Sequence, residues 1–268
     1  MNMDCGIASS QFLEIASEQR LSILLRLLEQ KTRVSSVAKE LDATVPEVFR
    51  NFERLAKVGL ITKEADGDYS ITPYGKIMCT QVHALQFMLQ NKAYFKTHQF
   101  GDLPEKFLHR IGALASGIHV KGFVRVMEQW SEIYSTADKY LYNILFEVPY
   151  SKELVEPLAK KLSDNVKVKS IFSFSAITPK ERKKVIDSYG FKKFIDDGLL
   201  ERKMKEDVSV LLVLNEKKAA VMFPTTSGEV DMSEMFYSTE PEFHEWCLDY
   251  FKHCWESSSL FQESKIKS

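Results

Sequence analysis

The chain has 268 residues, of which 44% are hydrophobic and 27% are charged. This composition is ordinary for a folded globular protein and excludes extensive disorder, and the length is sufficient for two domains. The formal net charge is −1, so any affinity for nucleic acid must come from cations gathered locally.

The cysteine content and the lack of long apolar runs indicate the compartment. Four cysteines are scattered without the pattern of a small secreted domain, which favours a reducing cytosol. The first residues lack the basic and apolar blocks of a signal peptide, and the longest apolar runs are too short to span a bilayer. We therefore expect a cytoplasmic protein without a membrane segment.

Three helices are predicted at the front of the chain. The first covers residues 12–30, and its apolar stripe has helical spacing at Leu21, Leu24, Leu25 and Leu28. A short helix follows over 35–41. The third covers 44–58, with Val48, Phe52 and Leu55 as its buried stripe. Its start, Thr44-Val45-Pro46-Glu47, has the pattern of a capping box, and Gly59 is predicted to end it.

A hairpin and a further helix are predicted next. Residues 60–63 and 69–72 have β character, and Asp66-Gly67 supplies the turn between them. The helix that begins near Tyr74 has an apolar face of Met78, Val82, Leu85 and Leu89. Three short helices followed by a two-stranded hairpin predict a winged helix-turn-helix, in which the third helix enters the major groove of DNA.

The third helix has a positive face opposite its apolar stripe. Arg50, Arg54 and Lys57 lie at i, i+4 and i+7. Asn51 can pair with adenine as arginine can with guanine, and Thr44 at the helix start can donate to a phosphate. Such cations on an isolated helix are usually only solvated, but the helix-turn-helix context favours contact with DNA.

Residues 10–90 resemble the winged-helix repressors of bacteria and archaea. The stretches that carry the resemblance are Ser17–Leu24, Val48–Leu55, Val58–Ile61 and Tyr69–Lys76. The resemblance implies that Arg50 and Asn51 read bases and that Ser35, Ser36 and Thr44 contact the DNA backbone. One departure is the acidic wing tip, residues 64–68, where many wings carry cations that reach a narrow minor groove. On this wing only Lys63 is well placed to contact DNA.

The back half alternates helices with strands, which predicts an α/β or α+β domain. Predicted helices cover 130–146 and 152–162, and capping-box patterns at 178–181 and 239–242 open two more. Predicted strands cover 166–174, 208–214 and 219–223. From about Leu103 this half resembles the effector domain of archaeal regulators associated with methanogenesis and cell filamentation, chiefly through Pro241–Phe251, Cys254-Trp255 and the strand around 219–224. The resemblance implies that it senses an unknown ligand or holds a dimer together.

Enzymatic and metal-binding interpretations find little support. His119-Val120-Lys121 has the spacing of the phospholipase D superfamily motif, but Val126 stands where that motif has an aspartate. His244, Cys247 and Cys254 share one helix face, although buried cysteines on an apolar face explain them more simply than zinc. We therefore expect no enzyme activity, no cofactor and no metal.

Together these observations predict an α+β protein with three parts: a winged helix-turn-helix over 1–90, a helical linker or dimerisation segment over 91–135, and an α/β effector domain over 136–268. We expect a transcriptional regulator that binds double-stranded DNA as a homodimer and responds to a possible small-molecule effector. The alternatives are a winged-helix protein–protein adapter and an enzyme with a catalytic C-terminal domain. The predicted DNA-binding residues are Ser35, Ser36, Thr44, Arg50, Asn51, Arg54, Lys57 and Lys63.

Overall fold

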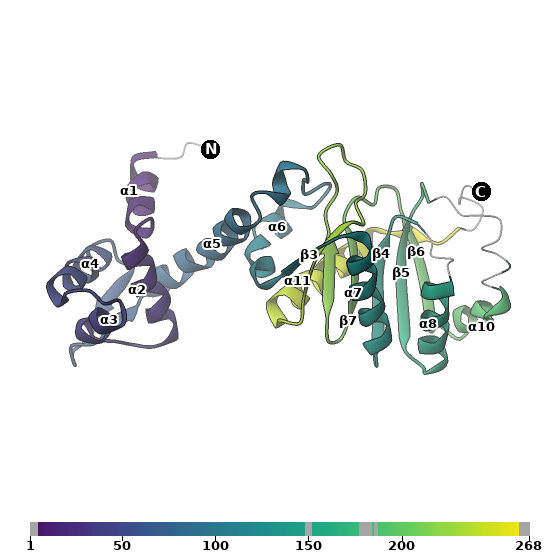
Figure 1. Ribbon diagram of the computed structural model, residues 1–268, viewed down its shortest axis with the longest axis horizontal. Helices are drawn as coiled ribbons and strands as arrows, with labels where there is room; N and C mark the ends of the chain where they lie inside the picture. Colours follow the sequence, from purple (N-terminus) through teal and green to yellow (C-terminus); the bar gives the residue numbers. More distant parts are fainter. Residues whose placement is uncertain (1–4, 148–151, 177–183, 185–186, 263–268) are drawn as a thin grey trace. The chain divides into compact units, whose positions relative to one another are not determined.

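The computed structural model describes residues 5–147, 152–176, 184 and 187–262. It divides into two compact units, Met1–Leu85 and Gln86–Ser268. The first consists of helices with a small hairpin, and the second is an α/β unit around an eight-stranded mixed sheet (Figure 1). The predicted α+β class is confirmed.

The first unit is a winged helix-turn-helix. Its elements are α1 (Cys5–Ile15), α2 (Glu18–Glu29), α3 (Val34–Glu40), α4 (Val45–Lys57), β1 (Ile61–Lys63), β2 (Tyr69–Ile71) and the first part of α5 (Pro73–Gln90). The wing strands β1 and β2 pair antiparallel, with Ile61 opposite Ile71. The core joins the helices to the wing, because the ring of Phe52 on α4 packs edge-on against that of Tyr69 at 4.7 Å.

The helix predicted over 12–30 is two helices, and its apolar stripe lies one residue earlier than predicted. The buried positions of α2 are Arg20, Ile23, Leu24 and Leu27, whereas Leu25 and Leu28 are exposed. The two stripes have the same spacing, so spacing alone could not separate them. Arg20 occupies the buried face because its guanidinium donates to the carbonyl oxygens of Leu13 and Glu14, both at 2.8 Å, at the end of α1.

The capping box predicted for α4 is wrong, and its predicted end is confirmed. Thr44 is the N-cap, but its hydroxyl makes no capping bond. The Glu47 carboxylate instead accepts from Gln19 Nε2 at 2.7 Å, so this glutamate ties α4 to α2. At the other end Gly59 has φ +78°, the left-handed conformation that glycine adopts without strain.

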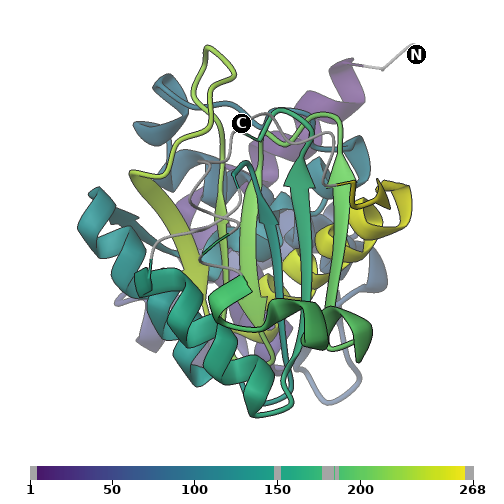
Figure 2. The same cartoon turned by 90° about the vertical axis from the view of Figure 1, so that its right-hand side faces the viewer.

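The second unit is a mixed sheet in the order β10-β6-β5-β4-β7-β8-β9-β3. Strands β4, β5 and β6 run parallel, and the other pairings are antiparallel. Figure 2 shows α7, α8 and α10 on one face of the sheet and α11 on the other. In chain order the elements after α5 are η1 (Tyr94–Lys96), α6 (Glu105–Leu108), η2 (Ile111–Ser116), β3 (Ile118–Lys121), α7 (Phe123–Thr136), β4 (Tyr140–Leu145), α8 (Lys152–Ser163), β5 (Lys167–Ser173), α10 (Phe191–Asp196), β6 (Leu200–Lys205), β7 (Leu211–Asn215), β8 (Ala219–Met222), β9 (Glu234–Ser238), α11 (Pro241–Ser257) and β10 (Ser259–Leu260).

The sequence predicted some elements of this unit and missed others. The strands predicted over 166–174, 208–214 and 219–223 correspond to β5, β7 and β8. The helix predicted over 130–146 is wrong in its second half, which is the strand β4. Segment 91–135 contains β3 and most of α7, and both belong to the second unit. The capping box at 239–242 is also wrong, since Glu240 is the N-cap of α11 without a side-chain bond. The one at 178–181 lies outside the described residues.

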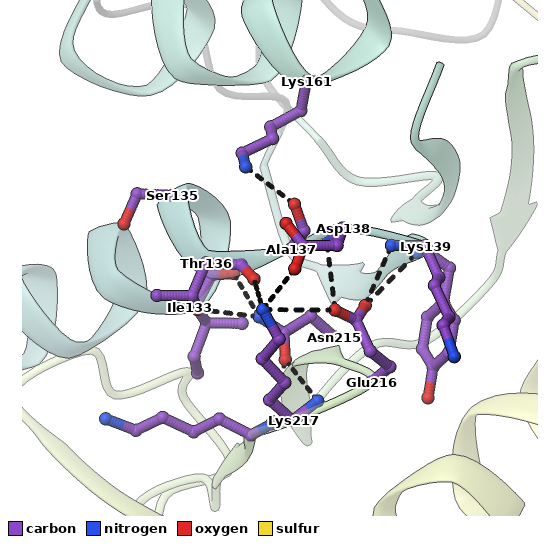
Figure 3. A network of polar contacts seen from close by, with 12 residues as sticks. Ile133, Ser135, Thr136, Ala137, Asp138, Lys139, Lys161, Asn215, Glu216 and Lys217 are labelled. Atoms are coloured by element: carbon purple, nitrogen blue, oxygen red, sulfur yellow. Dashed lines mark hydrogen bonds and ion pairs between the residues drawn. The ribbon is translucent and has the colours of Figure 1, made fainter. Parts of the chain in front are cut away.

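A polar network fixes the start of β4 (Figure 3). The buried side chain of Asn215 donates to the carbonyl of Ile133 at 2.7 Å and to Thr136 Oγ1 at 3.0 Å, which ties the end of β7 to the end of α7. The Glu216 carboxylate accepts from the backbone N–H groups of residues 138–140, at 2.9, 3.2 and 3.4 Å. These bonds satisfy backbone donors where the chain turns from α7 into the sheet. Among the described residues, no helix has the length and apolar character needed to cross a bilayer.

Candidate nucleic-acid interface

Helix α4 presents a positive face to solvent. Its apolar stripe, Val48, Phe52 and Leu55, is fully buried, as predicted. Arg50, Arg54 and Lys57 are exposed on the remaining surface. The packing of one face therefore leaves the cations of the other face accessible to a polyanion.

Arg50 and Lys57 are the least engaged of these cations. Arg50 Nε reaches only the carbonyl of Pro46 in its own helix, at 3.4 Å. Lys57 forms no ion pair among the described residues. A guanidinium that is free at its tip can present its donor fork to a base edge or to a phosphate.

Asn51 is held differently from the other predicted base readers. Its side chain is half-buried, donates to Gln19 Oε1 at 2.7 Å and accepts from Arg20 Nη1 at 3.4 Å. Gln19 in turn donates to Glu47. Asn51 thus joins α4 to α2, and it must leave these partners before it can reach a base.

Arg54 is paired with a carboxylate from α1. Its Nη2 lies 2.7 Å and its Nε 3.0 Å from the two oxygens of Glu14, a two-pronged contact. Glu14 is only 13% exposed, and its Oε2 also lies 3.1 Å from Arg20 Nε. The hydrogen bond from Arg54 lowers the pKa of Glu14, so this carboxylate keeps its charge and competes with phosphate for Arg54.

The other predicted contacts lie on exposed parts of the module. Ser35 and Ser36 are exposed in the first turn of α3, and Thr44 is exposed at the start of α4. Lys63 extends from β1, with its Nζ 5.9 Å from the centre of the Tyr69 ring. These positions leave all four side chains accessible.

The acidic wing tip is paired with cations that the sequence analysis did not single out. Arg33 Nε lies 2.7 Å from Asp68 Oδ1, and Lys31 Nζ lies 3.4 Å from Glu64 Oε1. Ser70 donates to Glu64 at 2.6 Å, and this hydrogen bond is the main cause of the lowered pKa of Glu64. Both cations lie in the segment before α3 and not in the wing itself. They offset part of the negative charge of the wing tip, so the tip is less repulsive to phosphate than its own residues suggest.

Two apolar residues on the accessible side of α4 were also missed. Val45 is 51% exposed and Phe49 is 43% exposed, one turn apart. Apolar side chains in a major groove can contact the methyl group of thymine. Phe49 lies outside the predicted buried stripe of α4, so the sequence alone could have indicated that its side chain is exposed.

The residues considered for catalysis or metal binding in the second unit are engaged in the fold. His119 and Lys121 on β3 both contact Glu234 Oε2, at 2.8 and 3.0 Å, while Val126 is buried in α7. Cys247 and Cys254 are buried, and burial raises the pKa of both thiols. Within the described part of the chain, no three His, Cys, Asp or Glu residues are grouped so as to hold a metal ion.

Comparisons with known proteins give structural likenesses only. No family model matches the chain, and none of the curated proteins matches it. Among solved structures it is similar to TrmBL2, described as an archaeal chromatin protein with a novel mode of DNA binding; the match covers 91% of this chain and 94% of that one, at 11% identity and a TM-score of 0.43. Partial matches are Nuc, a phospholipase D family member from Salmonella typhimurium (55% of this chain, 99% of that one, TM-score 0.39), and NucT from Helicobacter pylori (52% and 92%, TM-score 0.40), both at 11% identity.

All three likenesses have 11% identity and TM-scores below 0.5, so no role of this chain follows from them. What this chain binds has to be argued from its own side chains.

Proposed function

We propose that the chain is a cytoplasmic transcriptional regulator that binds double-stranded DNA through α4 and senses a small molecule through its second unit. The observation that carries the proposal is the outward positive face of α4, with Arg50 free at its tip. A helix in this position of a helix-turn-helix module has the size to enter a major groove. The proposed role is binding rather than catalysis.

The side chains on the accessible surface divide into two proposed roles. Arg50, with Phe49 beside it, reads base edges. Lys57, Lys63 and the exposed hydroxyls of Ser35, Ser36 and Thr44 contact the sugar–phosphate backbone. Arg54 and Asn51 join them only after Glu14 and Gln19 release them. With a net charge of −1, the affinity depends on these local cations.

We further propose that the regulator is a homodimer held by α5. The apolar face predicted for this helix is only partly used in the chain itself: Leu85 is 55% exposed and Leu89 is 72% exposed. Leucines one turn apart on a long helix are typical of a helix–helix seam between copies. Two copies would present two α4 helices to successive half-sites.

The test is a binding titration with duplexes selected from a random pool by the wild-type chain. Arg50→Ala should weaken binding by about tenfold and relax the sequence preference, because a bidentate base contact is worth about 1–3 kcal/mol. Lys57→Ala should weaken binding to all duplexes alike and reduce the salt slope by about one. Lys192→Ala, which removes an exposed lysine of α10, is the matched control and should leave both unchanged.

Two results would count against this proposal. If Arg50→Ala binds the selected duplexes as the wild type does, α4 is not the reading helix. If the wild type enriches no duplex and binds none at low salt, the winged helix serves another purpose, and the protein–protein adapter becomes the better interpretation.

A further inference from the structure

The second unit contains a cavity of about 800 Å3 at the carboxyl ends of β4 and β5. Leu145 and Ser173, the last residues of these parallel strands, line it. The next strand in the sheet, β7, runs antiparallel to β4, so the cavity lies where the strand direction changes. Carboxyl ends of parallel strands beside such a change are a common place for ligands in α/β proteins.

The body of the cavity is apolar. Met127 and Trp130 of α7 and Leu154 of α8 line it from the helices that cover this face of the sheet. Trp130 and Leu145 are buried, so this part of the wall is built into the core. A volume of this size suits a drug-sized organic molecule, which would lose its contact with water against these side chains.

The charged groups that line the cavity are all acidic in the described part of the chain. They are Glu147 after β4, Asp207 before β7 and Glu229 in the loop between β8 and β9, and no lysine, arginine or histidine joins them among the described lining residues. None of the three carboxylates forms an ion pair with another described residue. Their combined field favours a cation and disfavours an anion.

Two of these loops, those that carry Asp207 and Glu229, also hold the segment that follows α5 and η1. Ser209, two residues after Asp207, donates to Asp102 Oδ1 at 2.6 Å and accepts from the Asp102 N–H at 3.3 Å. On the other loop, Pro224 accepts from the Gln99 N–H at 2.9 Å and Asp231 Oδ2 lies 2.9 Å from His98 Nε2. Gly101 fits so closely that an added Cβ would lie 2.4 Å from Ser209 Oγ.

We propose that this cavity binds the effector of the regulator and that the effector is an organic cation: a small amine with an apolar body. The apolar wall takes the body, and the carboxylates at the loops take the charge. Because the same loops hold residues 98–102, a ligand between them acts on the chain that leads back to α5. This inference rests on the proposed DNA-binding function for its regulatory part, but ligand binding itself requires no DNA.

Three compounds with one body and different charges test the ligand class: 4-phenylbutylamine, 4-phenylbutanol and 4-phenylbutyrate, titrated into the full chain by calorimetry at low salt. The amine should bind about tenfold more tightly than the carboxylate, with the alcohol between them, since each exposed ion pair adds a factor of up to about five. The triple variant Glu147→Gln, Asp207→Asn, Glu229→Gln should bind all three compounds alike. The control Glu245→Gln, an exposed acid on α11 that does not line the cavity, should keep the preference for the amine.

Absence of heat with all three compounds up to about 5 mM would overturn the proposal, as would equal or reversed affinities in the wild type. The regulatory part is tested by repeating the duplex titration with the amine at saturation, where a shift of about fivefold is expected. An unchanged DNA affinity would overturn the effector role. A chain that binds the amine but no duplex would instead contradict the DNA-binding function, so the two failures are distinguishable.

Discussion

Side chains from neighbouring helices determine which polar residues of α4 are free to contact DNA. Arg54 has the exposure that a phosphate contact needs, yet Glu14 holds it through two hydrogen bonds from α1. Asn51 has the chemistry of an adenine reader, yet it bridges to Gln19. The positive stripe was predictable because it depends on helical spacing alone. The partners were not, because Glu14 and Gln19 belong to other helices and no local pattern connects them to α4.

Glu14→Gln should strengthen DNA binding by up to about fivefold, because an amide cannot hold Arg54 by charge and an ion pair with an exposed partner is weak. The measurement is a titration of the selected duplexes at fixed salt. Glu29→Gln is the control for net charge. It removes the same charge from the same unit, but the native Glu29 pairs with Arg26 and not with Arg54. Equal gains in both variants, or no gain in either, would contradict competition for Arg54.

Glu216 should contribute stability that depends on pH. Burial opposes its charge, but the backbone N–H groups that donate to it outweigh burial and lower its pKa below the ordinary value of 4.5. A carboxyl with a lowered folded-state pKa stabilises the fold above its unfolded pKa and loses this contribution as pH falls through the folded value. Glu216→Gln should therefore lower the free energy of unfolding by about 1–2 kcal/mol at pH 7.

The difference between the wild type and Glu216→Gln should shrink as pH falls below 4.5, which urea unfolding at several pH values can measure. Glu128→Gln on the exposed side of α7 is the control and should change little at any pH. If the difference in the free energy of unfolding stays constant as the pH falls, the shape of Glu216 rather than its charge accounts for its contribution.

At the scale of elements, local signals located the hairpin and the third helix of the winged helix, but only some of the strands of the sheet. Short-range patterns predict the hairpin, the third helix and the glycine that ends this helix, and the structure contains all three. Strand β4 was mistaken for helix because its buried residues continue the spacing of α7: after Ile133 and Ala137 come Leu141, Ile144 and Leu145, which a helix could also place on one face. Its strand character comes from β5 and β7, which pair with it from distant parts of the chain.

At the joint between the wing and α5, we expect a glycine-to-alanine substitution to change stability in the opposite direction from helix propensity. Gly75 lies in the first turn of α5, where alanine would ordinarily stabilise a helix by about 1 kcal/mol. Here an added Cβ would lie 2.1 Å from the carbonyl oxygen of Leu60, a backbone atom that cannot move away cheaply. Gly75→Ala should therefore destabilise the first unit by about 1–3 kcal/mol.

Thermal unfolding of the full chain measures this effect. Thr80→Ala is the control: it lies at an exposed position of the same helix and should be neutral or slightly stabilising. A melting temperature for Gly75→Ala at or above that of the wild type would show that the joint relaxes without cost.

For the whole molecule, the decisive property is whether two copies act together on DNA. A single winged helix with few free cations should bind weakly, and a dimer gains because its second half-site contact is intramolecular. Leu85→Glu with Leu89→Glu places two charges on the exposed apolar part of α5, so we expect sedimentation equilibrium to show a monomer. The same variant should bind the selected duplexes at least about tenfold more weakly and with a smaller salt slope, because fewer phosphates are contacted per complex.

The matched variant Gln86→Glu with Gln90→Glu adds the same two charges to exposed polar positions of α5. It therefore distinguishes the effect of added charge from the effect of losing the apolar helix–helix contact. It should remain dimeric, with a modest loss of DNA affinity from added repulsion. If the leucine variant stays dimeric, another surface joins the copies. If it becomes monomeric but keeps its affinity and salt slope, one copy suffices for binding, and the spacing of half-sites is not part of how this chain recognises DNA.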